Sequence, residues 1–169
     1  MKNIFLLIIV FYFLSCTSRK LPYHYLSPGV ENIKIFPATK KDSLTIQKID
    51  SSITKSMEEC MKIKNAMCID ERGIMILDAT FPKGMYYFRI ALFHTLKFPK
   101  HVKKGENRVL VTIGTQNNIE SVDVYQYTDL NSKKSIEEAF RSEELNRWGS
   151  AKIYGIPVKE QFEIGIFIK

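Results

Sequence analysis

RVLVTIGTQNNIESVDVYQ, residues 108–126, decides the fold, because it predicts two strands that pair with each other. From Val109 to Ile113 every second residue is apolar, which is typical of a strand with one buried face. The alternation returns in residues 121–128, where two valines share one face. Between them, the residues GTQNN at 114–118 favour a tight turn. The stretch therefore predicts an antiparallel hairpin.

The residues after the hairpin predict one helix and a last strand. Ser135 and Glu138 have the spacing of a capping box at the start of a helix. In residues 160–169, EQFEIGIFIK, apolar residues alternate with others, as in a strand. The order strand–strand–helix–strand predicts an α+β fold, with a small antiparallel sheet and a helix on one of its faces. The helix would place four apolar residues on one side: Ile136, Ala139, Phe140 and Leu145.

Two helices and a short strand are expected before this sheet. Residues 42–63 repeat apolar residues every three or four positions, and Asp42 or Ser43 can cap that helix. Residues 74–81 have the composition of a short strand. Residues 85–96 predict a mostly buried helix that ends before the sequence Lys-Phe-Pro, because a residue preceding proline avoids helical geometry.

The first sixteen residues, MKNIFLLIIVFYFLSC, indicate export. Residues 4–14 are eleven consecutive apolar residues that follow the charged Lys2. A helix that crosses a bilayer needs about 20 such residues, so this run fits a signal peptide at 1–15 better than a membrane span. Ser15 directly before Cys16 resembles the bacterial lipobox, in which the cysteine is acylated and becomes the new N-terminus. The alternative is a plain signal peptide with an incidental cysteine.

Lipidation at Cys16 implies a chain anchored in a bacterial cell envelope and facing the periplasm. Thr17 stands where some bacteria use aspartate to retain lipoproteins at the inner membrane, which favours the outer membrane. Residues 16–41 predict a short, irregular, basic tether near lipid headgroups. Beyond it, the patterns separate a helical extension, 42–79, from a C-terminal domain, 80–169.

The charge of the chain is positive. The whole sequence carries +7, and removing residues 1–15 takes away only Lys2, which leaves +6. Export argues against nucleic acid as a partner. Anionic headgroups or acidic segments of other proteins fit the compartment better. A surface kept soluble by lysines is the equally simple alternative.

Cys60 and Cys68 remain after Cys16 and would meet an oxidising compartment. In one continuous helix they would lie about 12 Å apart along the axis, whereas a disulfide needs Cα atoms within about 7 Å. Pairing therefore requires the helix to end between them, and Asn65 offers a stop. A disulfide and two buried thiols are both compatible with the sequence.

Four patterns in residues 80–169 resemble the TonB C-terminal domain family, and they follow in its order. They are TLKFPKHVKKG (95–105), the hairpin at 108–126, the helix SIEEAFRS, and WGSAKIYGIPVKEQFEIGIFIK at the end. Ser150 departs from the family's proline, and Asn117-Asn118 departs from its Asp-Gly turn. The positions that match are Pro99, Ala139, Trp148, Ala151, Gly155, Pro157 and Val158.

The resemblance implies a protein-binding module associated with TonB-dependent transport. In the family, an extended peptide of an outer-membrane transporter adds beside the last strand, so the partner would be such a transporter or another envelope protein. The chain shows no inner-membrane helix and no long Pro-rich spacer, so we expect a binding module and not a complete energy transducer. The implied partner-binding residues lie on that last strand: Gln161, Glu163, Gly165 and Phe167.

An enzyme is not expected, and neither is a cofactor or a metal. His24 lies in the tether, His94 in a buried helix as a core histidine, and His101 in a loop. No zinc-binding, nucleophile-elbow or phosphate-binding motif is present in the sequence. The alternative to strand addition is an envelope assembly or stress lipoprotein that docks through residues 42–81 and has no transport role.

Overall fold

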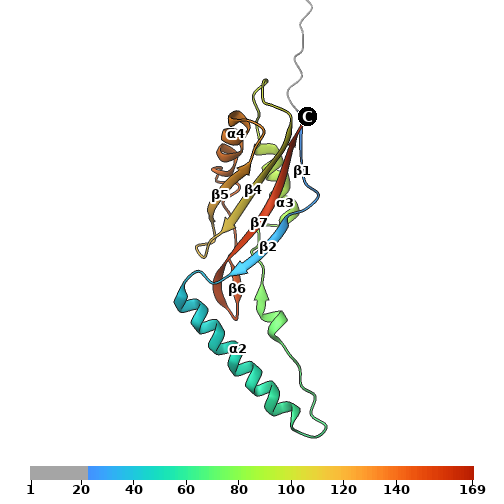
Figure 1. The fold of residues 1–169 in the computed structure, drawn as a ribbon, viewed down its shortest axis with the longest axis vertical. Helices are drawn as coiled ribbons and strands as arrows, with labels where there is room; N and C mark the ends of the chain where they lie inside the picture. Colours follow the sequence, from blue (N-terminus) through green and yellow to red (C-terminus); the bar gives the residue numbers. More distant parts are fainter. Residues whose placement is uncertain (1–22) are drawn as a thin grey trace, which may run out of the picture.

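One antiparallel sheet runs through the computed structural model, which describes residues 23–169. Five strands follow one another across it in the order β3-β6-β7-β4-β5, and β1 and β2 also pair with β7 (Figure 1). The strands are β1 (His24–Leu26), β2 (Glu31–Phe36), β3 (Ile76–Leu77), β4 (Gly105–Ile113), β5 (Ile119–Gln126), β6 (Ala151–Ile153) and β7 (Ile156–Ile168).

The predicted hairpin is confirmed as β4 and β5. Val109 lies opposite Val124, and Val111 lies opposite Val122. Asn117 makes the turn with a φ of 60°, a left-handed conformation that asparagine tolerates better than most residues. The α+β class with an antiparallel sheet is confirmed as well. The short strand β6 was not predicted, and it stands between the last helix and β7.

Within residues 23–169, three α-helices accompany the sheet: α2 (Lys40–Met61), α3 (Met85–Thr95) and α4 (Leu130–Phe140), with a short 3₁₀ helix η1 (Arg72–Met75). The predicted caps were wrong for two of them. Thr39 caps α2, because its hydroxyl oxygen accepts the N–H of Asp42 at 3.1 Å. Asp129 caps α4 and forms the capping box with Ser132, six residues earlier than the predicted pair of Ser135 and Glu138. A carboxylate at the cap binds the first N–H groups of the helix.

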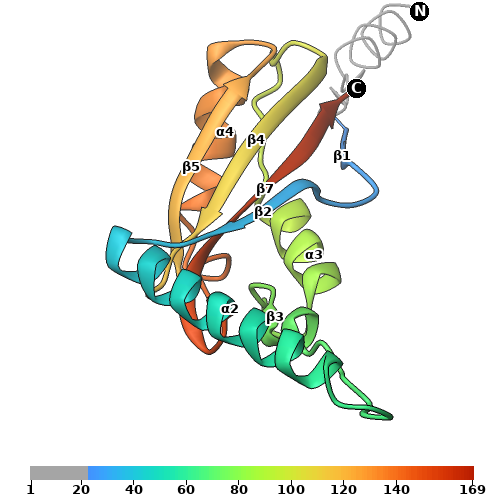
Figure 2. The same ribbon diagram turned by 60° about the horizontal axis from the view of Figure 1, so that its bottom comes forward.

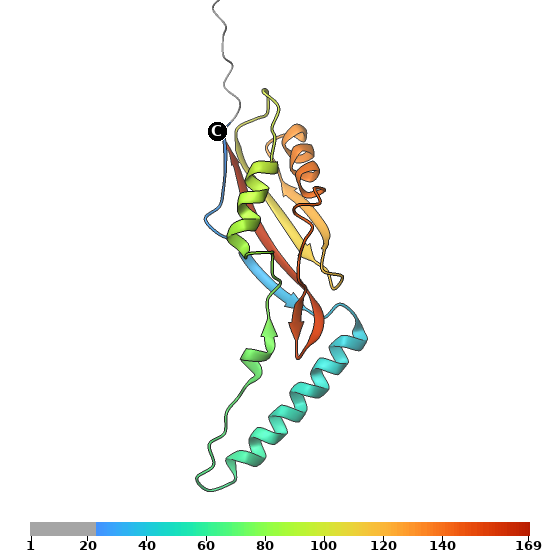
Figure 3. The same cartoon turned by 180° about the vertical axis from the view of Figure 1, so that it is seen from behind.

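The core lies between the sheet and the two helices α3 and α4. Both helices cover the same face of the sheet (Figure 3). Phe88 and Leu92 of α3 and Ile136 of α4 are completely buried there, and so are Phe162 and Ile164 of β7. The apolar alternation that predicted β7 therefore reflects burial of one face of this strand.

The segment predicted as an irregular tether contributes two strands to the sheet. β1 pairs with the end of β7, with His24 opposite Ile168, and β2 pairs with its middle, with Glu31 opposite Glu163. The prediction of an irregular segment was wrong over residues 24–36, because Pro and Gly mark only the turn between the two strands. Cys16 lies outside the described residues.

Residues 40–77 form a projection that we call the arm (Figures 1 and 2). α2 leads away from the sheet, and the chain returns through η1 to β3, which pairs with β6. The Tyr154 hydroxyl donates to a carboxylate oxygen of Asp50 at 2.9 Å and so ties α2 to the β6–β7 turn. α2 contains no fully buried residue. Cys60 and Cys68 form a disulfide near the far end of the arm.

Candidate functional site

β7 was predicted to offer a free edge to a partner peptide, and this prediction was wrong. Along one side β7 pairs with β4, from Glu160 to Ile168. Along its other side it pairs in turn with β6, β2 and β1. Both rows of its backbone groups are thus bound within the chain, and no room remains for strand addition while β1 and β2 stay in place.

The four residues predicted on that strand face away from the helices and make contacts within the fold. Glu163 accepts a hydrogen bond from the hydroxyl of Tyr125 at 2.7 Å. This bond is the first cause of the lowered pKa of the Glu163 carboxyl. The ring of Phe167 stacks on that of Tyr25 with centroids 4.8 Å apart.

The other two of these residues are equally engaged. The Gln161 side-chain amide donates to Thr112 Oγ1 at 3.1 Å. Gly165 exchanges two hydrogen bonds with Ser27, whose N–H donates to its carbonyl at 2.8 Å and whose Oγ accepts its N–H at 3.2 Å. All four residues therefore lie in the sheet but do not form a peptide-binding edge.

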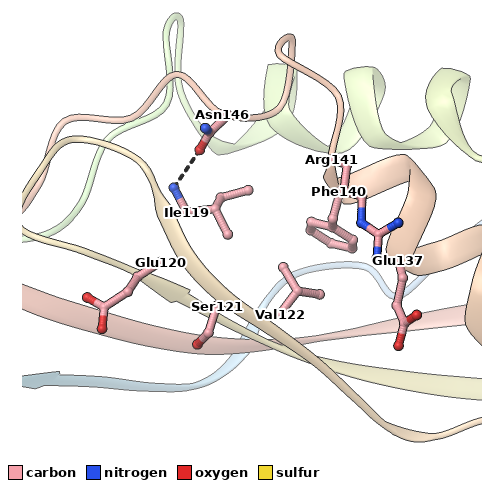
Figure 4. Close-up of a pocket in the computed structure, with 8 residues that line it drawn as sticks. All are labelled: Ile119, Glu120, Ser121, Val122, Glu137, Phe140, Arg141 and Asn146. Atoms are coloured by element: carbon pink, nitrogen blue, oxygen red, sulfur yellow. Dashed lines mark hydrogen bonds between the residues drawn. The ribbon is translucent and has the colours of Figure 1, made fainter.

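β5 forms one edge of the sheet. It pairs with β4 on one side, and no strand of residues 23–169 pairs with its other side. A groove of about 460 Å³ lies beside this edge, between β5 and the end of α4 (Figure 4). Its lining combines four residues of β5 with four from α4 and the segment after it: Ile119, Glu120, Ser121, Val122, Glu137, Phe140, Arg141 and Asn146.

The groove has an apolar floor and a charged rim. Phe140 is buried and Val122 is half-buried, so both present apolar surface at its base. Glu120 is neutralised by Lys159, which forms an ion pair with it. Glu137 lies near Lys133, at 3.9 Å between charged atoms. Arg141, on the surface at the end of α4, has no ion pair with any other residue of 23–169.

One end of the groove is closed by a side chain. The side-chain oxygen Oδ1 of Asn146 accepts the backbone N–H of Ile119 at 2.7 Å (Figure 4). Asn146 thus occupies, at the first residue of β5, the position that the carbonyl of a neighbouring strand would take. Beyond Ile119 the edge continues past Ser121, whose side chain is exposed. From Ser121 onward, no strand of residues 23–169 pairs with the outer side of β5.

Metal-ligating side chains and histidines are the remaining candidates for a chemical site. The described residues contain no group of three or more His, Cys, Asp or Glu side chains that could hold a metal ion. His24 approaches the carbonyl of Phe93 at 3.0 Å with Nε2, and His101 is exposed in its loop. The prediction of a buried core histidine at His94 was wrong, because this side chain lies on the solvent side of α3.

Comparisons with known families, curated proteins and solved structures give no match. Within residues 23–169, no helix has both the length and the apolar character needed to cross a bilayer.

Proposed function

We propose that this chain is a lipid-anchored, periplasm-facing protein-binding module that takes up an extended segment of an envelope partner by strand addition at β5. The resemblance to the TonB C-terminal domain suggests an outer-membrane transporter as that partner. The observation that supports the proposal is the edge of β5, which lies open beside a groove with an apolar floor.

Strand addition beside a helix supplies both affinity and selectivity. The N–H and C=O groups of β5 bind the main chain of the peptide, whereas the groove between β5 and α4 receives every second side chain. An apolar side chain fits over Val122 and Phe140. Arg141 at the rim favours an acidic residue in the same peptide. The preferred ligand is thus an extended segment with alternating apolar and acidic residues.

Residues 1–16 support the lipid anchor on sequence grounds. An acyl chain contributes about 0.8 kcal/mol for each CH₂ that enters the bilayer, so the chains of a lipidated Cys16 hold the module at a membrane surface. There the module meets the termini and loops of membrane proteins at high local concentration.

Photocrosslinking in the envelope tests the proposal. A photoreactive amino acid replaces Ser121 beside the groove, and in a matched variant it replaces Gln161 on the middle strand. Capture from Ser121 but not from Gln161, with the crosslink mapped to an extended segment of an envelope protein, is the expected result. Equal capture from both positions, or none from Ser121, would contradict strand addition at β5.

The arm favours a second candidate, an envelope lipoprotein that docks through residues 42–81 without a role in transport. α2 exposes Leu44 and contains no fully buried residue, so its apolar side chains have little cover within residues 23–169. A photoreactive residue at Leu44 that captures a protein, while Ser121 captures none, would support this candidate over strand addition.

A further inference from the structure

The end of the arm is a short, fixed loop. We define the tip as residues 61–69, MKIKNAMCI. The Cys60–Cys68 disulfide closes its base, where the two Cα atoms lie 6.0 Å apart. Inside it, Ile63 N–H donates to the carbonyl of Cys60 at 2.9 Å, and Ala66 N–H donates to that of Ile63 at 3.2 Å. The tip is therefore closed by a covalent bond and by backbone hydrogen bonds, although its apolar side chains pack against no core.

Large apolar side chains on the tip are turned to solvent. Met67 is 86% exposed, and Met61, Ile63 and Ile69 are each about two-thirds exposed. None of the four belongs to the buried core or packs against it. Isolated apolar residues on a surface are ordinary, but four within nine residues mark a site that contacts another protein or a membrane.

The charge of the tip is positive. Lys62 and Lys64 alternate with the apolar residues, and no acidic residue occurs between Cys60 and Ile69. Of the acids that flank the tip, Glu59 lies 4.0 Å from Lys55 and Asp70 binds Arg72 at 2.5 Å, whereas Glu58 and Glu71 form no ion pair within residues 23–169. Lys62 and Lys64 are the charged residues of the tip itself.

This combination matches a membrane surface better than a protein surface. Cores of protein interfaces are depleted in lysine and enriched in aromatic residues, arginine and methionine; of these enriched kinds residues 61–69 contain only methionine, and they carry two lysines. Segments that lie in the bilayer interface combine apolar side chains with lysines that bind anionic headgroups. We propose that the tip inserts its apolar side chains into the interface of an anionic lipid bilayer.

Contact between the tip and a membrane does not require the predicted lipid at Cys16. Tyr23 accepts the N–H of Lys169, so the described chain begins beside its C-terminus. The far end of the arm lies at the opposite end of the molecule (Figure 1). The inference also does not depend on peptide binding, because the groove at β5 and the tip share no residue.

Vesicle binding by residues 23–169 tests the proposal. This part of the chain contains the whole sheet and its core, and it lacks Cys16, so any binding arises from the folded protein. We expect sedimentation with vesicles of phosphatidylglycerol and phosphatidylcholine. M67D and I63D each lower the partition coefficient about tenfold or more, because each removes the burial of one large apolar side chain. K62Q/K64Q lowers binding to the anionic vesicles and leaves binding to pure phosphatidylcholine unchanged.

Leu130→Asp is the matched control. Leu130 is 73% exposed and lies on α4, away from the arm, so this variant adds the same charge to a comparable apolar position. Binding that falls in M67D and I63D but persists in L130D supports insertion of the tip. No binding of the unaltered chain, or equal losses in all three variants, would overturn it. Capture of a protein, but not of lipid, by a photoreactive residue at Met67 would also overturn it.

Discussion

Asn117 and Ser150 bind each other although 33 residues separate them in the sequence. The backbone N–H of Ser150 donates to the side-chain oxygen of Asn117 at 2.9 Å. In return, the backbone N–H of Asn117 donates to Ser150 Oγ at 3.1 Å. The Ser150 hydroxyl also donates to the carbonyl of Gly114 at 2.8 Å. The hairpin turn is thereby fastened to the segment that enters β6.

Removing either partner of this contact should destabilise the fold, and removing both should cost less than the sum. N117G keeps the left-handed turn but loses the side chain, whereas S150A loses the hydroxyl. Each variant leaves buried polar groups without a hydrogen-bond partner, which should lower the free energy of unfolding by about 1–3 kcal/mol. A double-mutant cycle by denaturant unfolding should give a coupling of about 0.5–3 kcal/mol. N117G combined with S51A on α2 is the control and should be additive. Additivity in the first pair would refute the contact.

Glu160 should make the protein less stable as the pH rises. Burial raises the pKa of its carboxyl, which is 2% exposed and accepts the N–H of Ala79 at 2.6 Å. Between the unfolded and folded pKa values the native state binds more protons than the unfolded state, so the free energy of unfolding falls across this window. E160Q removes the charge, and its amide oxygen can still accept the same bond.

Thermal unfolding across pH checks this prediction. The stability of E160Q relative to the unaltered protein should increase as the pH rises from about 4 toward neutrality. Glu160→Ala is the matched variant. It leaves the N–H of Ala79 without its partner, which costs about 1–3 kcal/mol at any pH. A difference between E160Q and the unaltered protein that does not change with pH would contradict the argument.

The paired strands were predictable because local alternation determines them. Val109, Val111 and Val124 occupy every second position on one face of their strands, and only one pairing buries them all. β1 was not predictable in this way, since three residues cannot show a period and its partner lies more than a hundred residues away. The cap of α4 was missed because Asp129 and Ser132 form a less familiar pair than the Ser135 and Glu138 that follow.

Truncating Trp148 should lower the free energy of unfolding more than truncating any other single residue of the core. Its ring contacts those of Phe81, Phe88 and Phe162, with centroid distances of 5.3, 5.0 and 5.7 Å. Its Nε1 donates to the carbonyl of Leu145 at 2.9 Å. W148A should lower the free energy of unfolding by about 3–5 kcal/mol.

W148F keeps an aromatic ring at this position and should cost less than W148A. Circular dichroism is the appropriate measurement, because Trp148 is the single tryptophan of the chain and its fluorescence is lost in both variants. Equal losses in W148A and W148F would show that the indole hydrogen bond, and not the packing of the ring, dominates.

Reduction of the Cys60–Cys68 disulfide should loosen the arm and leave the sheet intact. The bond closes a short loop, and its contribution of about 2–3 kcal/mol falls on the arm because α2 has no fully buried residue and its one contact with the core, Ile46, lies near its start, far from Cys60. Hydrogen exchange followed by mass spectrometry should show faster exchange in residues 57–70 on reduction. The exchange of β4 should not change. Faster exchange in both segments would mean that the arm and the sheet unfold together.

The candidate groove was only half predictable. The sequence indicates β5 and the helix beside it, and hence the existence of Val122 and Phe140 on facing surfaces. The sequence does not show whether β7 is an edge strand, because that depends on whether residues 24–36 pair with it. Proline at 28 and glycine at 29 made this segment look irregular throughout, and the edge was therefore assigned to β7.

The way in which β1 lies on β7 bears on how the protein withstands tension. β1 runs antiparallel to the end of β7, from His24 opposite Ile168 to Leu26 opposite Ile166. A pull on the chain at Tyr23, directed along the strand, acts parallel to β1 and therefore strains its bonds to β7 together, in shear. A pull at right angles to the sheet would break them one after another. A module tethered through this end thus resists force best along its own strands.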